Sequence, residues 1–478
     1  MKAYFVSFAL GFNYFVGFYY GVVSIIYTTL LTIALFVILR HAHRIKYEPF
    51  REYSISPETP SISILIPAYN EEKVVVRTIR STLAVDYPLF EVIVINDGSE
   101  DGTLEAVIGV FGLKKIDLVY RNILHTVPVK GFYANPEIPN LIVIDKERSG
   151  KADALNCGIT VSRSAYFCSV DADSLLERDS LIKLMTPIME SRSPVIASGG
   201  VVRILNGVTL KDTAIQEIGL PQGFLAMSQI VEYTRTFLFG RMGWNALNSL
   251  LILSGAFSLF HKAAVVEVGG YRRGSITEDM EIIVRLHEHY LRQKKPYRIK
   301  FISDPICWTE VPESLKMLGR QRRRWHLGLL KTMCQHRSLI FNPKYGRMGL
   351  LVLPYYLFFE TLGPVVELTG YVAVVCCYLL GLLSTDFVLL FLTLAIFYGT
   401  FLSTAGVFLS ELTYRRYPKW SHFLRLVKYS LLENFCYRQM NAYWRTQALI
   451  QFIRGRSDWE HVADKGQGVT GEVPHDEP

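Results

Sequence analysis

The N-terminal end of the chain carries its longest uncharged stretch, which limits what the protein can fold into. No Asp, Glu, Lys or Arg occurs from Ala3 to Leu39. A helix of that length would be about 55 Å long, against about 30 Å of hydrocarbon in a bilayer. Gly, Asn and Tyr residues gather in 11–21, so we expect residues 1–45 to form an interfacial segment and one transmembrane anchor near 18–39. Two tight spans are the alternative, and a cleaved secretory signal would have a shorter apolar run.

The composition of the whole chain agrees with a membrane protein. Half of the 478 residues are hydrophobic and 20% are charged, against about 25% charged residues in a typical soluble domain. The seven cysteines lack C-x-x-C spacing, which argues against a zinc ribbon or a thiol redox motif. The net charge of +8 comes from Lys and Arg that flank apolar segments. This is the pattern of cytoplasmic loops, so we expect a lipid bilayer and no nucleic acid as a partner.

The C-terminal part contains two further apolar runs, 365–385 and 387–410, joined without Lys or Arg. Basic residues on their outer sides predict a hairpin that starts and ends in the cytoplasm. We therefore expect residues 347–411 to form a re-entrant or interfacial helix followed by this transmembrane hairpin. Residues 412–457 are expected to form an interfacial or membrane-packed helix, and 458–478 a flexible cytoplasmic tail.

Residues 58–310 have a different pattern, in which short apolar runs alternate with helical stretches. This alternation predicts an α/β domain with a mostly parallel sheet and helices on both faces, inserted between the N- and C-terminal transmembrane helices. Ligands of such sheets bind beyond the carboxyl ends of the strands. The strand-like runs are 62–66, 91–95, 117–120, 141–144, 166–170 and 195–198, and a helix is predicted from 150 to 161.

Acidic side chains follow two of these runs. Asp171 and Asp173 lie two residues apart, so extended backbone directs both carboxylates to one side. Such oxygen ligands suit Mg or Mn held together with substrate phosphates, and a solvated acidic turn is the alternative. Asp97 follows another run, where it would accept hydrogen bonds from a base or ribose, or form an Asx-turn. Tyr69 would stack on a base or simply pack.

Two predicted helix starts carry further candidates. Lys151 opens the helix 150–161, where free N–H groups favour phosphate; an exposed helix-start lysine is the alternative. Glu278 and Asp279 open an amphipathic helix. Acidic residues are ordinary at that position, but Asp279 would also serve as a general base toward a sugar hydroxyl.

The segment 311–346 is predicted to contain amphipathic interface helices and carries the sequence Gln321-Arg322-Arg323-Arg324-Trp325. One interpretation is an interfacial helix with cytoplasmic Arg and a Trp at headgroup depth. The other is functional, with Arg on a diphosphate leaving group and Trp stacked on a sugar.

These elements occur together and in a fixed order. The motifs are Pro67-Ala68-Tyr69-Asn70-Glu71, Asp97-Gly98-Ser99, Lys151-Ala152-Asp153-Ala154-Leu155-Asn156, Asp171-Ala172-Asp173, Ser254-Gly255-Ala256-Phe257, Thr277-Glu278-Asp279 and Gln321-Arg322-Arg323-Arg324-Trp325. Over roughly residues 60–330, this set resembles family 2 membrane glycosyltransferases, the group that holds cellulose, chitin, hyaluronan and poly-N-acetylglucosamine synthases.

The resemblance implies a GT-A domain on the cytoplasmic face of a bacterial membrane and an inverting transfer from a UDP-sugar. It also implies a role for each matched position. The expected nucleotide- and donor-binding residues are Tyr69, Glu71, Asp97, Lys151, Asp153, Asp171, Gln321 and Arg324; the metal ligands are Asp173 and Asp171; the catalytic residues are Asp279, as base, and Glu278; the acceptor-binding residues are Trp325, Ser254 and Gly255.

The sequence therefore predicts a membrane-embedded, metal-dependent and processive synthase that adds GlcNAc or glucose to a β-linked polysaccharide and couples this to export. Its expected partners are the UDP-sugar, a glycan or glycolipid acceptor, the bilayer and accessory export proteins. One alternative is a non-processive enzyme that places one sugar on a lipid, and a remote one is a non-catalytic transport or structural protein. Trp459-Glu460-His461-Val462 weakly resembles a Trp-containing loop of related synthases.

Overall fold

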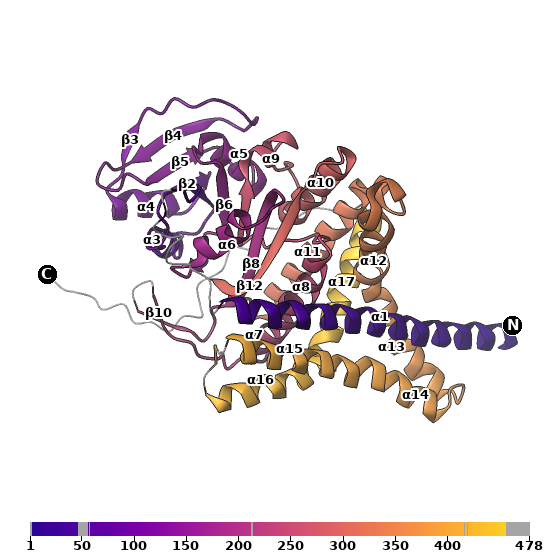
Figure 1. The fold of residues 1–478 in the computed structure, drawn as a ribbon. Helices are drawn as coiled ribbons and strands as arrows, with labels where there is room; N and C mark the ends of the chain where they lie inside the picture. The colour runs from indigo at the N-terminus through magenta and orange to yellow at the C-terminus, as the bar shows by residue number, and fades with distance from the viewer. Residues whose placement is uncertain are drawn as a thin grey trace. The chain divides into compact units, whose positions relative to one another are not determined.

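The computed structural model describes residues 2–45, 56, 58–211, 214–414, 416–417 and 419–455. The chain divides into two compact units (Figure 1). The first unit combines residues 1–42, 222–246 and 312–460, and the second combines 43–221, 247–311 and 461–478. Residues 58–221 and 247–310 of the predicted insert lie in the second unit, whereas 222–246 belongs to the helical unit. The tail 458–478, including Trp459-Glu460-His461-Val462, lies outside the described residues.

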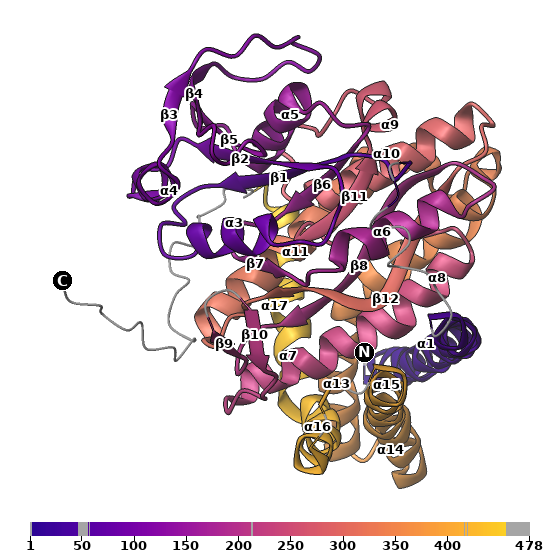
Figure 2. The same ribbon diagram turned by 60° about the vertical axis from the view of Figure 1, so that its left-hand side comes forward.

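The second unit is built on a ten-stranded sheet in the order β3-β4-β5-β2-β1-β6-β11-β8-β12-β7 (Figure 2). A separate two-stranded sheet pairs β9 with β10. The strands are β1 (Ile62–Ala68), β2 (Phe90–Asp97), β3 (Lys114–Ile116), β4 (Val129–Ala134), β5 (Leu141–Lys146), β6 (Tyr166–Val170), β7 (Ser174–Leu176), β8 (Val195–Ile204), β9 (Thr209–Lys211), β10 (Ala214–Glu217), β11 (Phe257–His261) and β12 (Arg298–Thr309).

The sheet and its helices confirm the α/β class. The predicted sheet was mostly parallel, whereas the observed sheet contains both parallel and antiparallel pairs of strands. Strands β5, β2, β1 and β6 form a parallel centre. Strand β11 is antiparallel to both β6 and β8, and β4 is antiparallel to β5. The predicted strand 117–120 is wrong: these residues are irregular and Val119 is fully exposed.

Helices cover both faces of the sheet, as expected from the alternation. Helix α5 packs on β1 and β2, and its Gly158 lets it approach closely, because an added Cβ would lie 3.0 Å from Leu65 and 3.1 Å from Ile95. Helix α3 lies on the opposite face (Figure 2). The crossover from β1 to β2 through α3 and the crossover from β5 to β6 through α5 run in opposite directions across the sheet, and right-handed crossovers of opposite direction place their helices on opposite faces. The helices are α3 (Val75–Leu83), α4 (Thr103–Phe111), α5 (Lys151–Val161), α6 (Ser180–Met189), α9 (Lys262–Glu267) and α10 (Glu278–Arg292).

The first unit is helical, and several of its helices contain π-helical turns. Helix α1 (Lys2–Ile45) is continuous, so the alternative of two tight spans is wrong. The other elements are α7 (Phe224–Arg235), η1 (Thr236–Arg241), α8 (Met242–Ala246), α11 (Leu315–Gln335), η2 (Arg337–Leu339), η3 (Pro343–Tyr345), η4 (Met348–Val352), α12 (Leu353–Tyr355), η5 (Tyr356–Thr361), α13 (Gly363–Leu379), α14 (Thr385–Leu392), η6 (Thr393–Phe397), α15 (Tyr398–Tyr414), α16 (Trp420–Leu432), η7 (Glu433–Tyr437) and α17 (Arg438–Ile453).

Two helical stretches, Val6–Arg40 and Thr385–Tyr414, are long and apolar enough to cross a membrane. A third candidate is the pair Met348–Thr361 and Gly363–Leu379, which is bent by 42° at its break. This bend lies in the segment 347–411, which was expected to begin with a re-entrant or interfacial helix. The apolar helices therefore associate the protein with a membrane.

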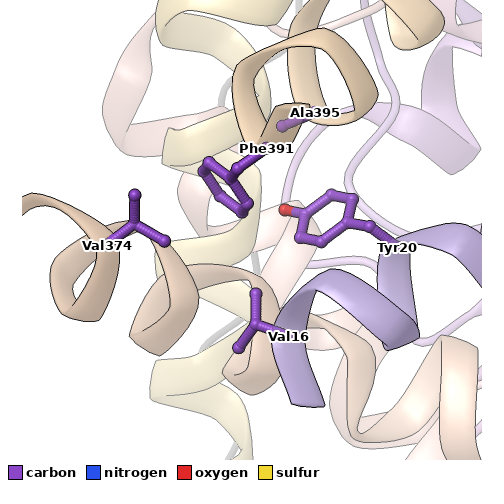
Figure 3. Close-up of a cluster of buried hydrophobic side chains, with 5 residues drawn as sticks. All are labelled: Val16, Tyr20, Val374, Phe391 and Ala395. Atoms are coloured by element: carbon purple, nitrogen blue, oxygen red, sulfur yellow. The ribbon is translucent and has the colours of Figure 1, made fainter. Parts of the chain in front are cut away.

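A buried cluster joins α1 to the C-terminal helices (Figure 3). It consists of Val16, Tyr20, Val374, Phe391 and Ala395, and the Tyr20 and Phe391 rings meet edge to face at 5.3 Å. A small residue such as Ala395 in this cluster allows apolar helices to pack closely. Segments at opposite ends of the sequence thus form one helical bundle.

Candidate active site

The turn after β6 presents the two acidic residues that the sequence singled out. Asp173 is buried and the side chain of Asp171 is about a third exposed. Three other segments fix the turn: the Thr78 hydroxyl donates to the Ala172 carbonyl at 2.7 Å, the Asp171 N–H donates to the Ala256 carbonyl at 3.3 Å, and the Thr309 hydroxyl donates to Asp173 at 3.5 Å. The carboxylates are thus held by α3, by the segment before β11 and by β12.

Lys151, the first residue of α5, connects this turn to α10. Its Nζ lies 2.6 Å from Asp171 Oδ1 and 2.9 Å from Glu278 Oε1. Burial alone would lower the pKa of Lys151, but the two carboxylates raise it well above its ordinary value. The side chain is therefore a fixed positive charge beside the acidic turn.

Asp279 follows Glu278 in the first turn of α10. Its Oδ2 accepts the Gly255 N–H at 3.3 Å and its Oδ1 accepts the Met280 N–H at 2.9 Å. A Cβ at Gly255 would lie 3.1 Å from Lys151 Nζ and 3.5 Å from Asp279 Oδ2, so only glycine fits without a shift. Ser254 accepts the Ala256 N–H at 3.3 Å. The structure thus brings Asp171, Lys151, Glu278, Asp279 and the 254–255 loop together.

Asp97 is buried, and protein groups bind both of its carboxylate oxygens. Lys146 Nζ lies 2.5 Å from Oδ1, and the N–H groups of Ser149 and Gly150 donate to Oδ1 and Oδ2 at 3.1 and 2.6 Å. Asp97 therefore fixes the loop that leads into α5, a role that neither reading of the sequence foresaw. Its predicted contact with a nucleotide stays a prediction.

Asp153 does not have the environment that we expected for a residue facing a diphosphate. Its side chain is fully buried and forms ion pairs with Lys146 at 3.0 Å and Arg273 at 2.6 Å. These two cations neutralise its carboxylate inside the protein, and its predicted contact with the donor stays a prediction. Lys146 and Arg273 were missed in the sequence: the only local signal was a lysine ending an apolar strand.

The expected base-binding residues follow β1. The guanidinium of Arg148, which the sequence analysis also missed, lies 4.2 Å above the centre of the Tyr69 ring. Glu71 is half-buried, and its N–H donates to the Thr103 hydroxyl at 2.9 Å. The roles of Tyr69 and Glu71 toward a base or ribose stay predictions.

The Gln-x-x-Arg-Trp sequence lies on α11, in the first unit. Arg322 is buried, pairs with Glu232 at 2.6 Å, donates to the Tyr437 hydroxyl at 2.9 Å and lies 4.5 Å above the Trp325 ring. Gln321 and Arg324 are half-buried. Because these residues belong to the other unit, the contacts expected of Gln321, Arg324 and Trp325 with donor and acceptor stay predictions.

The described residues contain no group of three or more His, Cys, Asp or Glu side chains that could hold a metal ion. A Mg site of the kind used with phosphate substrates needs only one or two carboxylates. Asp171 and Asp173 supply hard oxygen ligands at one turn, which fits a divalent cation that binds together with a diphosphate.

Comparison with known proteins identifies the family. The sequence model described as "Glycosyltransferase like family 2" matches residues 60–328, more than half of the chain. The chain therefore belongs to glycosyltransferase family 2, and its α/β unit is of the GT-A type, as the motifs predicted.

Two similar proteins from staphylococci carry the same name. The poly-beta-1,6-N-acetyl-D-glucosamine synthase of Staphylococcus aureus (strain COL) is 28% identical over 297 residues, which cover 62% of this chain and 60% of the relative. The protein of the same name from Staphylococcus epidermidis is 28% identical over 345 residues, or 71% of this chain and 70% of the relative. The chain thus spans about 60% of the length of the S. aureus relatives that it matches.

Among solved structures, the chain is similar to the mannosyltransferase PcManGT from Pyrobaculum calidifontis, solved with GDP-Man and Mn2+. The TM-score is 0.48 at 18% identity, covering 85% of this chain and 99% of that one. The similarity to S. aureus TarS 1-349 with UDP-GlcNAc has a TM-score of 0.37 at 14% identity, covering 86% and 98%.

Proposed function

We propose that this protein is an inverting glycosyltransferase that moves a sugar from a UDP-sugar to the end of a growing β-linked polysaccharide. The observation that carries the proposal is the contact of Lys151 with both Asp171 and Glu278, next to Asp279. This arrangement sets a fixed cation and the two acidic residues that open α10 close to one loop, 254–255, because a Cβ at Gly255 would lie 3.1 Å from Lys151 Nζ and 3.5 Å from Asp279 Oδ2.

Lys151 would stabilise the leaving group. Breaking the bond between sugar and phosphate builds negative charge on UDP, and a preorganised cation stabilises that charge. A divalent cation bound by Asp171 and Asp173 would supply additional positive charge on the diphosphate. Lys151 is suited to this task because its ion pairs hold it charged and in place before the donor binds.

Asp279 would act as the general base. It would accept the proton of the acceptor hydroxyl as that oxygen attacks the anomeric carbon from the face opposite the leaving UDP, which inverts the configuration. The backbone N–H groups of Gly255 and Met280 orient its carboxylate. Glu278 would position Lys151, to which it is paired.

The names of the two staphylococcal relatives support UDP-GlcNAc as the first donor to test and a polymer as the product; UDP-glucose is the alternative. The apolar helices support synthesis at a bacterial cytoplasmic membrane, with the catalytic unit in the cytoplasm and the product exported, with or without accessory proteins. Transfer of one sugar to a lipid is the second candidate, which the membrane association also fits.

The test is incubation of the purified protein in lipid vesicles with a panel of UDP-sugars, with and without Mg or Mn. We expect UDP release with one donor, and products that lengthen with time. Products fixed at one or two sugars would support the lipid-directed alternative instead. Absence of UDP release with every donor would contradict the proposed function.

A further inference from the structure

The start of α10 and the segment before it are attached to α5 at three points. Lys151 pairs with Glu278 at 2.9 Å, Asp153 pairs with Arg273 at 2.6 Å, and Asn156 bonds the backbone of Tyr271. The three α5 residues lie in its first two turns. Helix α5 therefore determines where residues 271–279 run.

Asn156 makes the most specific of these attachments. It is buried, its Nδ2 donates to the Tyr271 carbonyl at 2.8 Å, and its Oδ1 accepts the Tyr271 N–H at 2.7 Å. One side chain thus binds both polar groups of one backbone residue, as a neighbouring strand would. The preceding Gly270 has a φ of +73°, and a Cβ there would lie 2.5 Å from Asn156 Oδ1. The close approach therefore requires glycine.

Arg273 makes the second attachment, on the side nearer the surface. Its Nε lies 2.6 Å from the fully buried Asp153, and its Nη2 donates to the His125 carbonyl at 2.7 Å. Asp153 is in turn paired with Lys146, the last residue of β5. Arg273 therefore joins the segment to α5 and, through Asp153, to the sheet.

Helix α5 is itself attached to the sheet. The Gly150 N–H, at the start of α5, donates to Asp97 at the end of β2. Helix α5 is thus held to the sheet at its start and holds the segment before α10 by its side chains. A shift of that segment would displace Glu278 and Asp279, which follow it directly in the chain.

We propose that Asn156 and Arg273 are positioning residues for the transfer step: through the 271–278 segment they place Asp279 relative to Lys151 and the turn at Asp171. This inference rests on the proposed function and deepens it. It predicts that their loss lowers the rate of transfer much more than the affinity for the donor, because misplacement of a reacting group by about 1 Å can cost about 10²-fold.

The first variant is Asn156→Asp, which keeps the size of the side chain and the acceptor for the Tyr271 N–H but removes the donor to its carbonyl. Asn135→Asp is the matched control, because Asn135 also donates to a backbone carbonyl, of Phe111 at 2.9 Å, and accepts an N–H, of Glu137 at 3.0 Å. Arg273→Gln is the second variant, in case a buried carboxylate at 156 prevents folding. The Arg273 side chain is 38% exposed, so this variant is expected to fold.

Two measurements on the full chain in vesicles separate positioning from general damage. Steady-state kinetics should show kcat lowered at least about tenfold in Asn156→Asp or Arg273→Gln, with KM for the UDP-sugar changed less than about threefold. Hydrogen exchange should show faster exchange of the peptide 271–279 in both variants, with other peptides of the second unit unchanged. Asn135→Asp should match the unsubstituted protein in kcat and in the exchange of 271–279.

An unchanged kcat in both folded variants, or a loss of donor affinity as large as the loss of kcat, would overturn the inference. The exchange of 271–279 does not depend on transferase activity. If the unsubstituted protein released no UDP, the proposed function would fail, and unaltered exchange in both variants would separately refute the attachment by Asn156 and Arg273.

Discussion

Lys151 Nζ lies 2.6 Å from Asp171 Oδ1. This pair joins the start of α5 to the turn after β6 and places a permanent positive charge beside the carboxylates proposed to bind a cation and a diphosphate. Substitution of Lys151 by Met should lower kcat by about 10²-fold or more, because a charged group that stabilises the leaving UDP is lost.

The measurement for Lys151→Met is UDP release at saturating donor. Lys183→Met is the control, since Lys183 also forms an ion pair, with Asp179 at 3.0 Å, but on α6. Activity of Lys151→Met within about threefold of that of the control variant would refute the role assigned to this side chain.

Gly255 is expected to tolerate no side chain. In Gly255→Ala the new methyl group would press on Lys151 Nζ, which lies 3.1 Å from the added Cβ, and would contact Asp279 at 3.5 Å. We expect transfer to fall about tenfold or more with little change in thermal stability. Gly109→Ala, where the added Cβ meets no atom within 4 Å, should leave transfer unchanged; equal activities of the two variants would show that the close approach at Gly255 is unimportant.

The buried Lys146 is expected to matter for stability. Lys146→Met leaves the carboxylates of Asp97 and Asp153 buried without this partner, which should cost about 3 kcal/mol or more in the free energy of unfolding. Adding Asp97→Asn and Asp153→Asn to that variant removes the two buried charges that Lys146 neutralised and should recover part of the loss. Thermal unfolding in detergent measures the loss in Lys146→Met and the recovery in the triple variant. If Lys146→Met were as stable as the unsubstituted protein, the buried pairing would be contradicted.

Several of these elements could be predicted from the sequence. The strands that end at Asp97 and Val170, the helix that starts at Lys151 and the helix 315–335 follow from local apolar patterns and helix-start residues. The antiparallel β11 and the transfer of 222–246 to the helical unit could not be predicted, because strand direction and packing depend on contacts distant in the sequence. The partners of Asp97 and Asp153 were missed for the same reason: a lysine at the end of an apolar run does not reveal which carboxylates it meets.

The pH dependence of stability should contain a contribution from His287. Burial lowers the pKa of His287 to about 4, although the hydrogen bond to the Leu250 carbonyl opposes this change. The neutral ring donates from Nε2 to that carbonyl at 2.7 Å and accepts from the Tyr297 hydroxyl at 2.6 Å. Since an unfolded histidine protonates near pH 6.5, the unfolded state binds more protons between pH 6.5 and 4, and stability should fall as the pH is lowered through this range.

Unfolding measured at pH 7.5 and pH 5 tests this expectation. His287→Asn should be less stable at pH 7.5 and should lose less stability on acidification than the unsubstituted protein, whereas His125→Asn, at an exposed histidine, should keep the full pH dependence. An unchanged pH dependence in His287→Asn would argue that the buried ring does not titrate in this range.

The most direct test of the proposed chemistry is single-turnover transfer by Asp279→Asn, with UDP binding measured on the same preparation. The control is Asp179→Asn, at the N-terminus of α6. If Asp279 removes the proton from the acceptor, Asp279→Asn should bind UDP as the unsubstituted protein does and transfer sugar at least about 10²-fold more slowly, while the control transfers normally. Transfer by Asp279→Asn at the rate of the control would contradict the account.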